Sequence, residues 1–166
     1  MTDVGAARAA MGAAVERLTT ARARDEILAE LRPARRIGPI RRPPVLTAIG
    51  RVWRLGVLLL SPDGQLYALG SVTRAVDPRH PNFQSLSGEE RREIRAAAMK
   101  AGFPIGVAVD YDAVPIDVAT GGGAVIVDRG VVKVSWNGSR DPAAWTDFAG
   151  YLHERVELLA DPPPGA

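Results

Sequence analysis

The sequence predicts an α+β protein in which an antiparallel sheet of about five strands packs against helices. Two observations support this class. First, two pairs of apolar, alternating segments are each joined by a short glycine-containing turn, as expected of β-hairpins. Second, helical segments flank these pairs instead of alternating with single strands, so the predicted element order is α-β-β-α-β-β-β-α.

Composition limits the class of protein. Hydrophobic residues make up 46% and charged residues 24% of the 166 residues, which fits one folded domain with at most an accessory segment. The chain has no run of 18 apolar residues that would span a membrane, and its first residues do not form a secretion signal. It has no cysteine, which excludes disulfides and thiolate chemistry. We therefore expect a cytoplasmic protein.

Charge is distributed unevenly along the chain. Residues 1–54 contain eleven arginines and five acidic residues, whereas residues 55–166 carry a net negative charge. The excess of arginine has two interpretations: a basic segment that binds nucleic acid, or GC-rich codon usage, which also accounts for the many Ala, Gly and Pro residues. The net charge of +2 is small for a protein that holds a polyanion, so nucleic acid is not the expected partner.

Prolines between residues 33 and 45 predict a boundary. Consecutive prolines cannot continue a helix, and the residue before a proline favours an extended backbone. We expect a basic helical segment over 1–32, a Pro/Arg linker over 33–45, a single α+β domain over 46–160 and a disordered tail over 161–166. Because the change in charge coincides with the linker, residues 1–42 are expected to be dispensable for the folding of the domain.

The clearest hairpin joins residues 51–60 to residues 65–74. The intervening Ser-Pro-Asp-Gly at 61–64 is typical of a type I turn followed by a left-handed glycine. Pairing Leu60 with Gln65 across this turn would place Arg51 opposite Arg74.

Two opposed arginines predict a site for an anion. Like charges directly opposite each other destabilise a strand pair, so an anionic group should lie between them. That group could be a carboxylate of the chain, a residue of another subunit or an anionic small ligand. The predicted ligand-binding residues are Arg51, Arg54, Arg74 and Asp77.

The second half of the chain continues the pattern. A helix is predicted over 87–101, with Gly102 ending it. Strands follow over 105–109 and 113–118, and Pro115 in the second strand indicates an edge position.

A second hairpin and a final helix complete the predicted domain. The hairpin is turned by Arg129-Gly130. The final helix is predicted to begin at Asp141, and its apolar stripe from Trp145 to Leu159 is expected to anchor the core, with Trp145 as a major contributor to stability.

Motifs for catalysis and metal binding are sparse. The sequence contains neither the G-x-S-x-G of hydrolases nor the phosphate-binding G-x-x-x-x-G-K-[ST]. His80 and His153 are interpreted as surface histidines. Asp110, Asp112 and Asp117 are interpreted as solvated turn carboxylates rather than a hard-cation site. We expect no metal or cofactor and identify no catalytic residue.

Two resemblances bear on fold and activity. The element order over 46–160 resembles that of roadblock and profilin-like domains. The segments RIGPI, RVWRLGVLLLSPDGQLYALGSVTRAV and YLHERVELL resemble small uncharacterised proteins of high-GC bacteria, some of which are labelled glutaminase. This label implies a hydrolase, but none of the six serines begins an S-x-x-K motif, and a Thr2 nucleophile would require cleavage after Met1.

We therefore expect a non-catalytic interaction or ligand-binding domain. It is predicted to form a homodimer, because the long apolar stripe of the first helix and the edges of an open sheet need cover. A small hydrolase whose active site is not recognised is the alternative.

Overall fold

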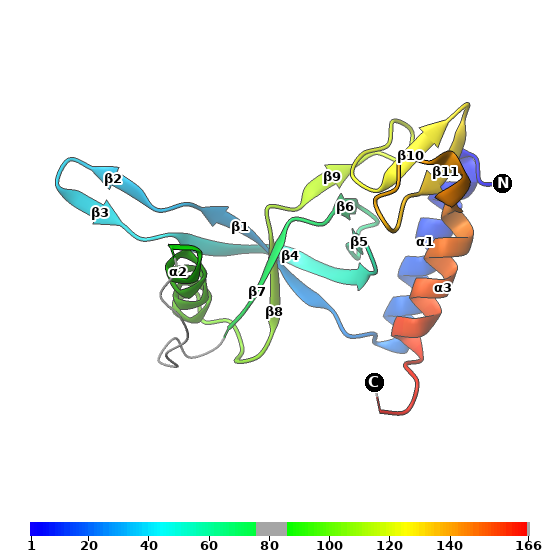
Figure 1. Ribbon diagram of the computed structural model, residues 1–166. Helices are drawn as coiled ribbons and strands as arrows, with labels where there is room; N and C mark the ends of the chain where they lie inside the picture. Colours follow the sequence, from blue (N-terminus) through cyan, green and yellow to red (C-terminus); the bar gives the residue numbers. More distant parts are fainter. Residues whose placement is uncertain (76–85, 166) are drawn as a thin grey trace. The chain divides into compact units, whose positions relative to one another are not determined.

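The computed structural model describes residues 1–75 and 86–165, which form two compact units (Figure 1). Unit 1 consists of Met1–Asp25, Arg51–Leu69 and Val114–Ala166, and unit 2 of Glu26–Gly50 and Gly70–Ala113. Both units are discontinuous in sequence. The chain therefore passes from unit 1 to unit 2 and back twice.

The α+β class is confirmed, but the main sheet has seven strands and not five. The hydrogen-bonded order is β7-β8-β1-β4-β5-β6-β9. The long strand β4 belongs to unit 2 up to Gly50 and to unit 1 from Arg51. The sheet also departs from a purely antiparallel arrangement, since β1 and β8 pair in parallel. The strands of the main sheet are β1 (Glu26–Arg32), β4 (Val45–Leu55), β5 (Leu58–Leu60), β6 (Leu66–Ala68), β7 (Ser71–Arg74), β8 (Ala108–Tyr111) and β9 (Val114–Ile116).

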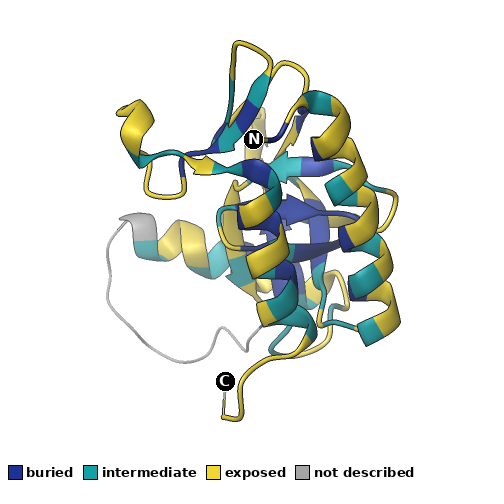
Figure 2. Cartoon of the chain, turned by 90° about the vertical axis from the view of Figure 1, so that its right-hand side faces the viewer, coloured by how far each residue is buried: buried dark blue, intermediate teal, exposed yellow. Residues whose placement is uncertain are grey.

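Unit 1 is built around two packed helices, α1 (Val4–Ala21) and α3 (Phe148–Ala160). Figure 2 shows exposed residues along both helices and buried strands behind them. A small sheet of β10 (Val125–Asp128), β11 (Val131–Val134) and β12 (Thr146–Asp147) completes the unit. The core residues are mostly large and apolar, and those with almost no exposed surface include Leu18, Leu55, Leu58, Leu60, Leu66, Phe148 and Leu152.

A tyrosine joins α3 to the turn between β4 and β5. The Tyr151 hydroxyl donates to the Leu55 carbonyl at 3.2 Å and accepts from the Val57 amide at 3.0 Å. The intervening Gly56 has φ +66°, and a Cβ there would lie 2.1 Å from the hydroxyl oxygen. Glycine is therefore required at this position, because a side chain would displace the tyrosine.

Unit 2 has a smaller core under a single helix, α2 (Leu86–Lys100). Ile94, Ala97 and Ala98 of α2 are buried in the same cluster as Ile27 of β1 and Val109 of β8. The helix ends as predicted, because Gly102 has φ +78° and its amide donates to the Met99 carbonyl. Two further strands, β2 (Arg35–Ile37) and β3 (Ile40–Arg42), form a separate hairpin in this unit.

The predicted first helix is wrong in its second half. Arg22 adopts a left-handed conformation with φ 51° and ends α1, and residues 26–32 form strand β1. Ile27, Leu28 and Ala29 are all buried, so both faces of this strand are covered. Tertiary burial here overrides the helix propensity of a segment rich in Ala, Leu and Glu.

The segment predicted as a linker contains secondary structure. Residues 35–42 are the β2–β3 hairpin, in which Gly38 and Pro39 form the two-residue turn and Gly38 supplies the positive φ that this turn requires. Residues 1–25 belong to the same compact unit as most of the chain after residue 113, so the units do not follow the predicted boundaries. Residues 161–165 form neither helix nor strand.

The predicted 51–60/65–74 hairpin is divided between four strands. The turn at 61–64 is confirmed, since the Gly64 amide donates to the Ser61 carbonyl at 2.9 Å and Gly64 has φ +85°. However, the chain also turns at Gly56, so β5 pairs with both β4 and β6. The continuation, β7, pairs with β8.

Other predicted features of the second half have mixed outcomes. The Arg129-Gly130 turn is confirmed, and so is the edge position of β9, which contains Pro115. Asp141 caps a short 3₁₀ turn, η1 (Pro142–Ala144), while α3 begins at Phe148 with Asp147 as its N-cap. Trp145 therefore precedes the helix and is half-buried.

Candidate functional site

The predicted arginine site is not assembled as expected. Arg51 lies in unit 1 on β4, whereas Arg74 lies in unit 2 on β7, where it pairs with Ala108. The predicted opposition of the two arginines is therefore wrong, because it assumed one uninterrupted hairpin. Arg54 lies on β4 opposite Leu59, and Asp77 is outside the described residues.

Arg51 and Arg74 each have a partner within their own unit. The Arg51 guanidinium forms an ion pair with both oxygens of Asp25, with Nε 3.1 Å from Oδ2, and this hydrogen bond raises the pKa of Arg51. Arg74 donates from Nη1 to the Gly106 carbonyl at 3.1 Å. The carboxylate that pairs with Arg51 is therefore Asp25, which follows the end of α1, and it is not shared with Arg74.

The strongest concentration of positive charge is the β2–β3 hairpin, residues 35–42, which we call the arginine hairpin. Its cross-strand pairs are Arg35 with Arg42 and Arg36 with Arg41. Because side chains alternate between the faces of a strand, each face of the hairpin carries one arginine pair. All four arginines are exposed.

One of the four arginines is neutralised by an acid. Arg41 forms an ion pair with Glu93 of α2, with Nη2 2.6 Å from Oε1. Hydrogen bonding to Arg41 lowers the pKa of Glu93, so this carboxylate is charged at neutral pH. Within residues 1–75 and 86–165, no acidic side chain pairs with Arg35, Arg36 or Arg42. Like charges that face each other across two strands destabilise a hairpin, and the ion pair with Glu93 offsets this repulsion for Arg41.

The tip of the arginine hairpin is apolar. Ile37 and Ile40 form the last pair before the Gly38-Pro39 turn, and their exposed fractions are 50% and 59%. Two large aliphatic side chains are thus exposed to solvent, next to Arg36 and Arg41 in the sequence. The hairpin combines the two side-chain types that insert into nucleic-acid grooves: cations that contact phosphates and apolar side chains that separate bases.

A cationic cavity lies at the base of the arginine hairpin. Its volume is about 230 Å³, several times the roughly 30 Å³ that one water occupies in the liquid. Among the described residues, no acidic residue lines it. The lining residues are Arg32, Pro33, Arg35, Arg42, Pro43, Val45 and Lys100. Four cations around one space favour an anion such as a phosphate group.

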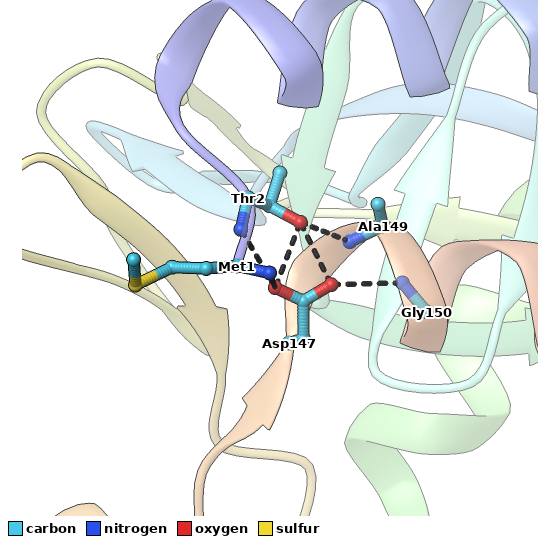
Figure 3. A network of polar contacts seen from close by, with 5 residues as sticks. All are labelled: Met1, Thr2, Asp147, Ala149 and Gly150. Atoms are coloured by element: carbon cyan, nitrogen blue, oxygen red, sulfur yellow. Dashed lines mark hydrogen bonds and ion pairs between the residues drawn. The ribbon is translucent and has the colours of Figure 1, made fainter.

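A polar network in unit 1 fixes the start of the chain to α3 (Figure 3). Thr2 is 3% exposed, its hydroxyl lies 2.7–2.8 Å from both Asp147 oxygens, and it accepts from the Ala149 amide at 3.2 Å. The Thr2 and Gly150 amides also donate to Asp147, and the Met1 amine lies 3.7 Å away.

The same network bears on the role of Thr2. Burial opposes ionisation of Asp147, but the hydrogen bonds from Thr2 and Gly150 outweigh it and lower the pKa of the carboxyl. Because its hydroxyl is buried and hydrogen-bonded, Thr2 has the environment of a structural anchor rather than of an exposed nucleophile.

The remaining candidates from the sequence are dispersed. His153 is exposed, as predicted, and His80 lies outside the described residues. Asp112 and Asp117 are exposed, but Asp110 is 2% exposed, so its interpretation as a solvated carboxylate is wrong. In the described part of the chain, no group of three or more His, Asp or Glu residues could hold a metal ion. No described helix is both long and apolar enough to cross a membrane.

No protein-family model, curated protein or solved structure matches this chain. The resemblances drawn from the sequence therefore stay untested, and the function must be argued from the geometry of the chain itself.

Proposed function

We propose that this protein is a non-catalytic binding protein that holds duplex DNA with its arginine hairpin. The observation that carries the proposal is the pairing of four exposed arginines on both faces of a two-stranded hairpin with isoleucines at its tip. A two-stranded ribbon has a width that the grooves of DNA accept.

Phosphate contacts would come from two places. Arg35, Arg36 and Arg42 have no acidic partner among the described residues, so they are available to the two phosphate backbones beside a groove. The cationic cavity at the base of the hairpin adds Arg32 and Lys100. Together these side chains would position the duplex without reading its sequence.

The small net charge of the chain does not oppose this proposal. The sequence-based expectation against nucleic acid used the total of +2, in which surplus cations of one region are cancelled by acids of another. Unit 2 carries eleven Lys and Arg against eight Asp and Glu, and unit 1 carries ten against eleven. Since fields are screened within about 8–10 Å at physiological salt, local density decides binding.

The test is the binding of a labelled 30-base-pair duplex, followed by fluorescence anisotropy at several salt concentrations. We expect a Kd of about 1–100 µM at physiological salt, typical of non-specific binding, and tighter binding at lower salt. The variant Arg35→Gln/Arg36→Gln/Arg42→Gln should bind at least about ten times more weakly. It should also have a log Kd versus log salt slope smaller by about 2–3, since each duplex phosphate contact contributes about 0.9.

A matched control removes the same charge from unit 1. Arg22, Arg24 and Arg129 are exposed, and replacing all three by Gln should change binding less than about twofold. Equal weakening by both triple variants would mean that net charge alone attracts DNA, and it would overturn the proposal. Binding to anionic lipid vesicles without binding to DNA would also overturn it and would assign the hairpin to membranes.

The proposal includes two finer expectations from the sequence, a cytoplasmic location and a homodimer. The support for the dimer is the exposure of apolar side chains on both edge strands of the main sheet, Val72 on β7 and Val114 on β9. Light scattering at micromolar concentration tests it, and the mass of a monomer would contradict it.

A further inference from the structure

A second candidate binding site lies in unit 1, independent of the arginine hairpin. A pocket of about 490 Å³ opens beside the loop that follows β11. Trp136 and Trp145 line it, and its remaining surface is largely aliphatic, with Val57, Leu69 and Ile126 among the contributors. We call it the tryptophan pocket. Its volume lies in the range of roughly 300–1,000 Å³ that is usual for small-ligand sites.

The wall of the tryptophan pocket is held by internal hydrogen bonds. The Ser139 carbonyl accepts from Trp145 Nε1 at 2.9 Å and from the Ser135 hydroxyl at 2.8 Å. The Ser139 hydroxyl accepts from the Asp141 amide at 3.1 Å. This loop therefore needs no ligand to order it, and a preformed pocket loses little conformational entropy on binding.

Two of the residues that line the pocket, Gly123 and Ala68, lie very close together. Gly123 has φ +55°, and a Cβ built on it would lie 2.6 Å from the Cβ of Ala68 on β6. Only glycine allows this contact, because a side chain would both strain the backbone and collide with the strand. This part of the lining therefore carries no side chain larger than the methyl group of Ala68, which leaves room for a flat ring.

Two further observations define the chemistry of a ligand. Trp136 is 53% exposed, so one large aromatic surface of the pocket faces solvent. Of the described residues that line the pocket, Arg140 is the one that is charged, and none is a carboxylate. An anion would find a partner in Arg140, whereas a cation would be attracted by the indole faces but repelled by this guanidinium.

We propose that the tryptophan pocket binds a small, flat aromatic acid. The ring would lie against the indoles of Trp136 and Trp145, and the carboxylate would pair with the guanidinium of Arg140. The lining at Gly123 and Ala68 would accept the edge of the ring system. The site is distinct from the DNA site, and neither proposal depends on the other.

The test compares three probes that share one ring system. 2-Naphthoate, 2-naphthalenemethanol and 2-naphthylmethylammonium carry a negative, a neutral and a positive group, and each is titrated into the full chain by isothermal titration calorimetry. We expect 2-naphthoate to bind at least about ten times more tightly than the alcohol, with no detectable binding of the ammonium compound. Equal affinity for all three, or no binding of 2-naphthoate at millimolar concentration, would overturn the proposal.

Two variants assign the contacts. Arg140→Gln should reduce the affinity for 2-naphthoate to that for the alcohol and leave the alcohol unchanged. Trp136→Ala should weaken both probes at least about tenfold, while Arg129→Gln, which removes an exposed arginine elsewhere in unit 1, should change neither.

Amide chemical shifts locate the bound probe and verify the fold of each variant. Shifts on 2-naphthoate addition should be confined to the loop at 135–140 and to Gly123. Shifts confined to the arginine hairpin would overturn the assignment to this pocket.

Discussion

The two units differ in how they use their residues. Unit 1 buries Leu18, Phe148 and Leu152 between helices and strands, whereas the smaller core of unit 2 includes four alanines, Ala29, Ala75, Ala97 and Ala98. Larger buried side chains contribute more to stability, at about 25 cal/mol for each Å² of apolar surface removed from water. Unit 2 in turn carries the surplus of positive charge. The difference indicates that unit 1 provides most of the stability and unit 2 presents the charged surface.

Removing α1 should have the largest effect. Deletion of residues 1–21 removes Leu18, the buried Ala7 and Ala14, and the Thr2 anchor from the core of unit 1. We expect loss of cooperative urea unfolding, followed by far-UV circular dichroism. The control is a variant that lacks residues 162–166, which follow the end of α3. This variant should unfold as the full chain does. Cooperative unfolding without residues 1–21 would instead support the sequence-based expectation that residues 1–42 are dispensable for folding.

The next largest effect is expected in unit 1, where we compare the stability lost on removing each of two aromatic side chains. Phe148→Ala should cost about 3–5 kcal/mol of unfolding free energy, because the side chain is completely buried. Trp145→Ala should cost less than about 2 kcal/mol, below that range, because the indole is half-buried and lines an open pocket. Urea denaturation of both variants gives the two values. A larger cost for Trp145 would mean that the core was assigned to the wrong aromatic residue.

In unit 2 the prediction concerns a buried side chain that is made larger instead of smaller. Ala98 has no exposed surface where α2 packs on the sheet, so Ala98→Leu should destabilise by about 1–3 kcal/mol through overpacking. The exposed Ala96, replaced by Leu, is the matched control on the same helix. Hydrogen exchange should accelerate at the amides of β8 and stay unchanged at those of β10. Equal acceleration at both strands would show that the units do not open separately.

The smallest effect depends on pH. Asp147 caps α3 and holds Thr2, so Asp147→Ala should cost about 0.5–2 kcal/mol at neutral pH, the range for loss of an N-cap. Because the pKa of Asp147 is lowered from 3.8, its charged form stabilises the fold fully above that pH. This contribution to stability is then lost as the pH falls through the lowered pKa of the folded state.

Unfolding of the wild type and the variant at neutral pH and at about pH 2.5 tests this sign. The difference between them should shrink in acid. Asp141→Ala, which removes the cap of a short 3₁₀ turn, should show a smaller cost at neutral pH. A difference that stays constant or grows in acid would contradict the assigned role of the Asp147 carboxylate.

Local sequence determined those features that depend on a few neighbouring residues. The turns at 61–64 and at Arg129-Gly130, the end of α2 at Gly102 and the edge position of Pro115 follow from backbone preferences of glycine and proline, which act wherever the chain places them. The arginines of the hairpin were also visible in the sequence. Their pairing was not, because prolines on both sides favour a linker and a Gly-Pro dipeptide does not by itself predict the tip of a hairpin.

Only the tertiary structure decided features that depend on distant partners. Residues 26–32 are a strand because β8, more than 75 positions later, pairs with them and both of their faces are buried. Arg51 meets Asp25 rather than Arg74 because the chain turns at Gly56, where Tyr151 leaves no room for a side chain. The tryptophan pocket is likewise formed by loops that come together only on folding. Propensities describe single segments, whereas burial and pairing depend on what the rest of the chain brings to them.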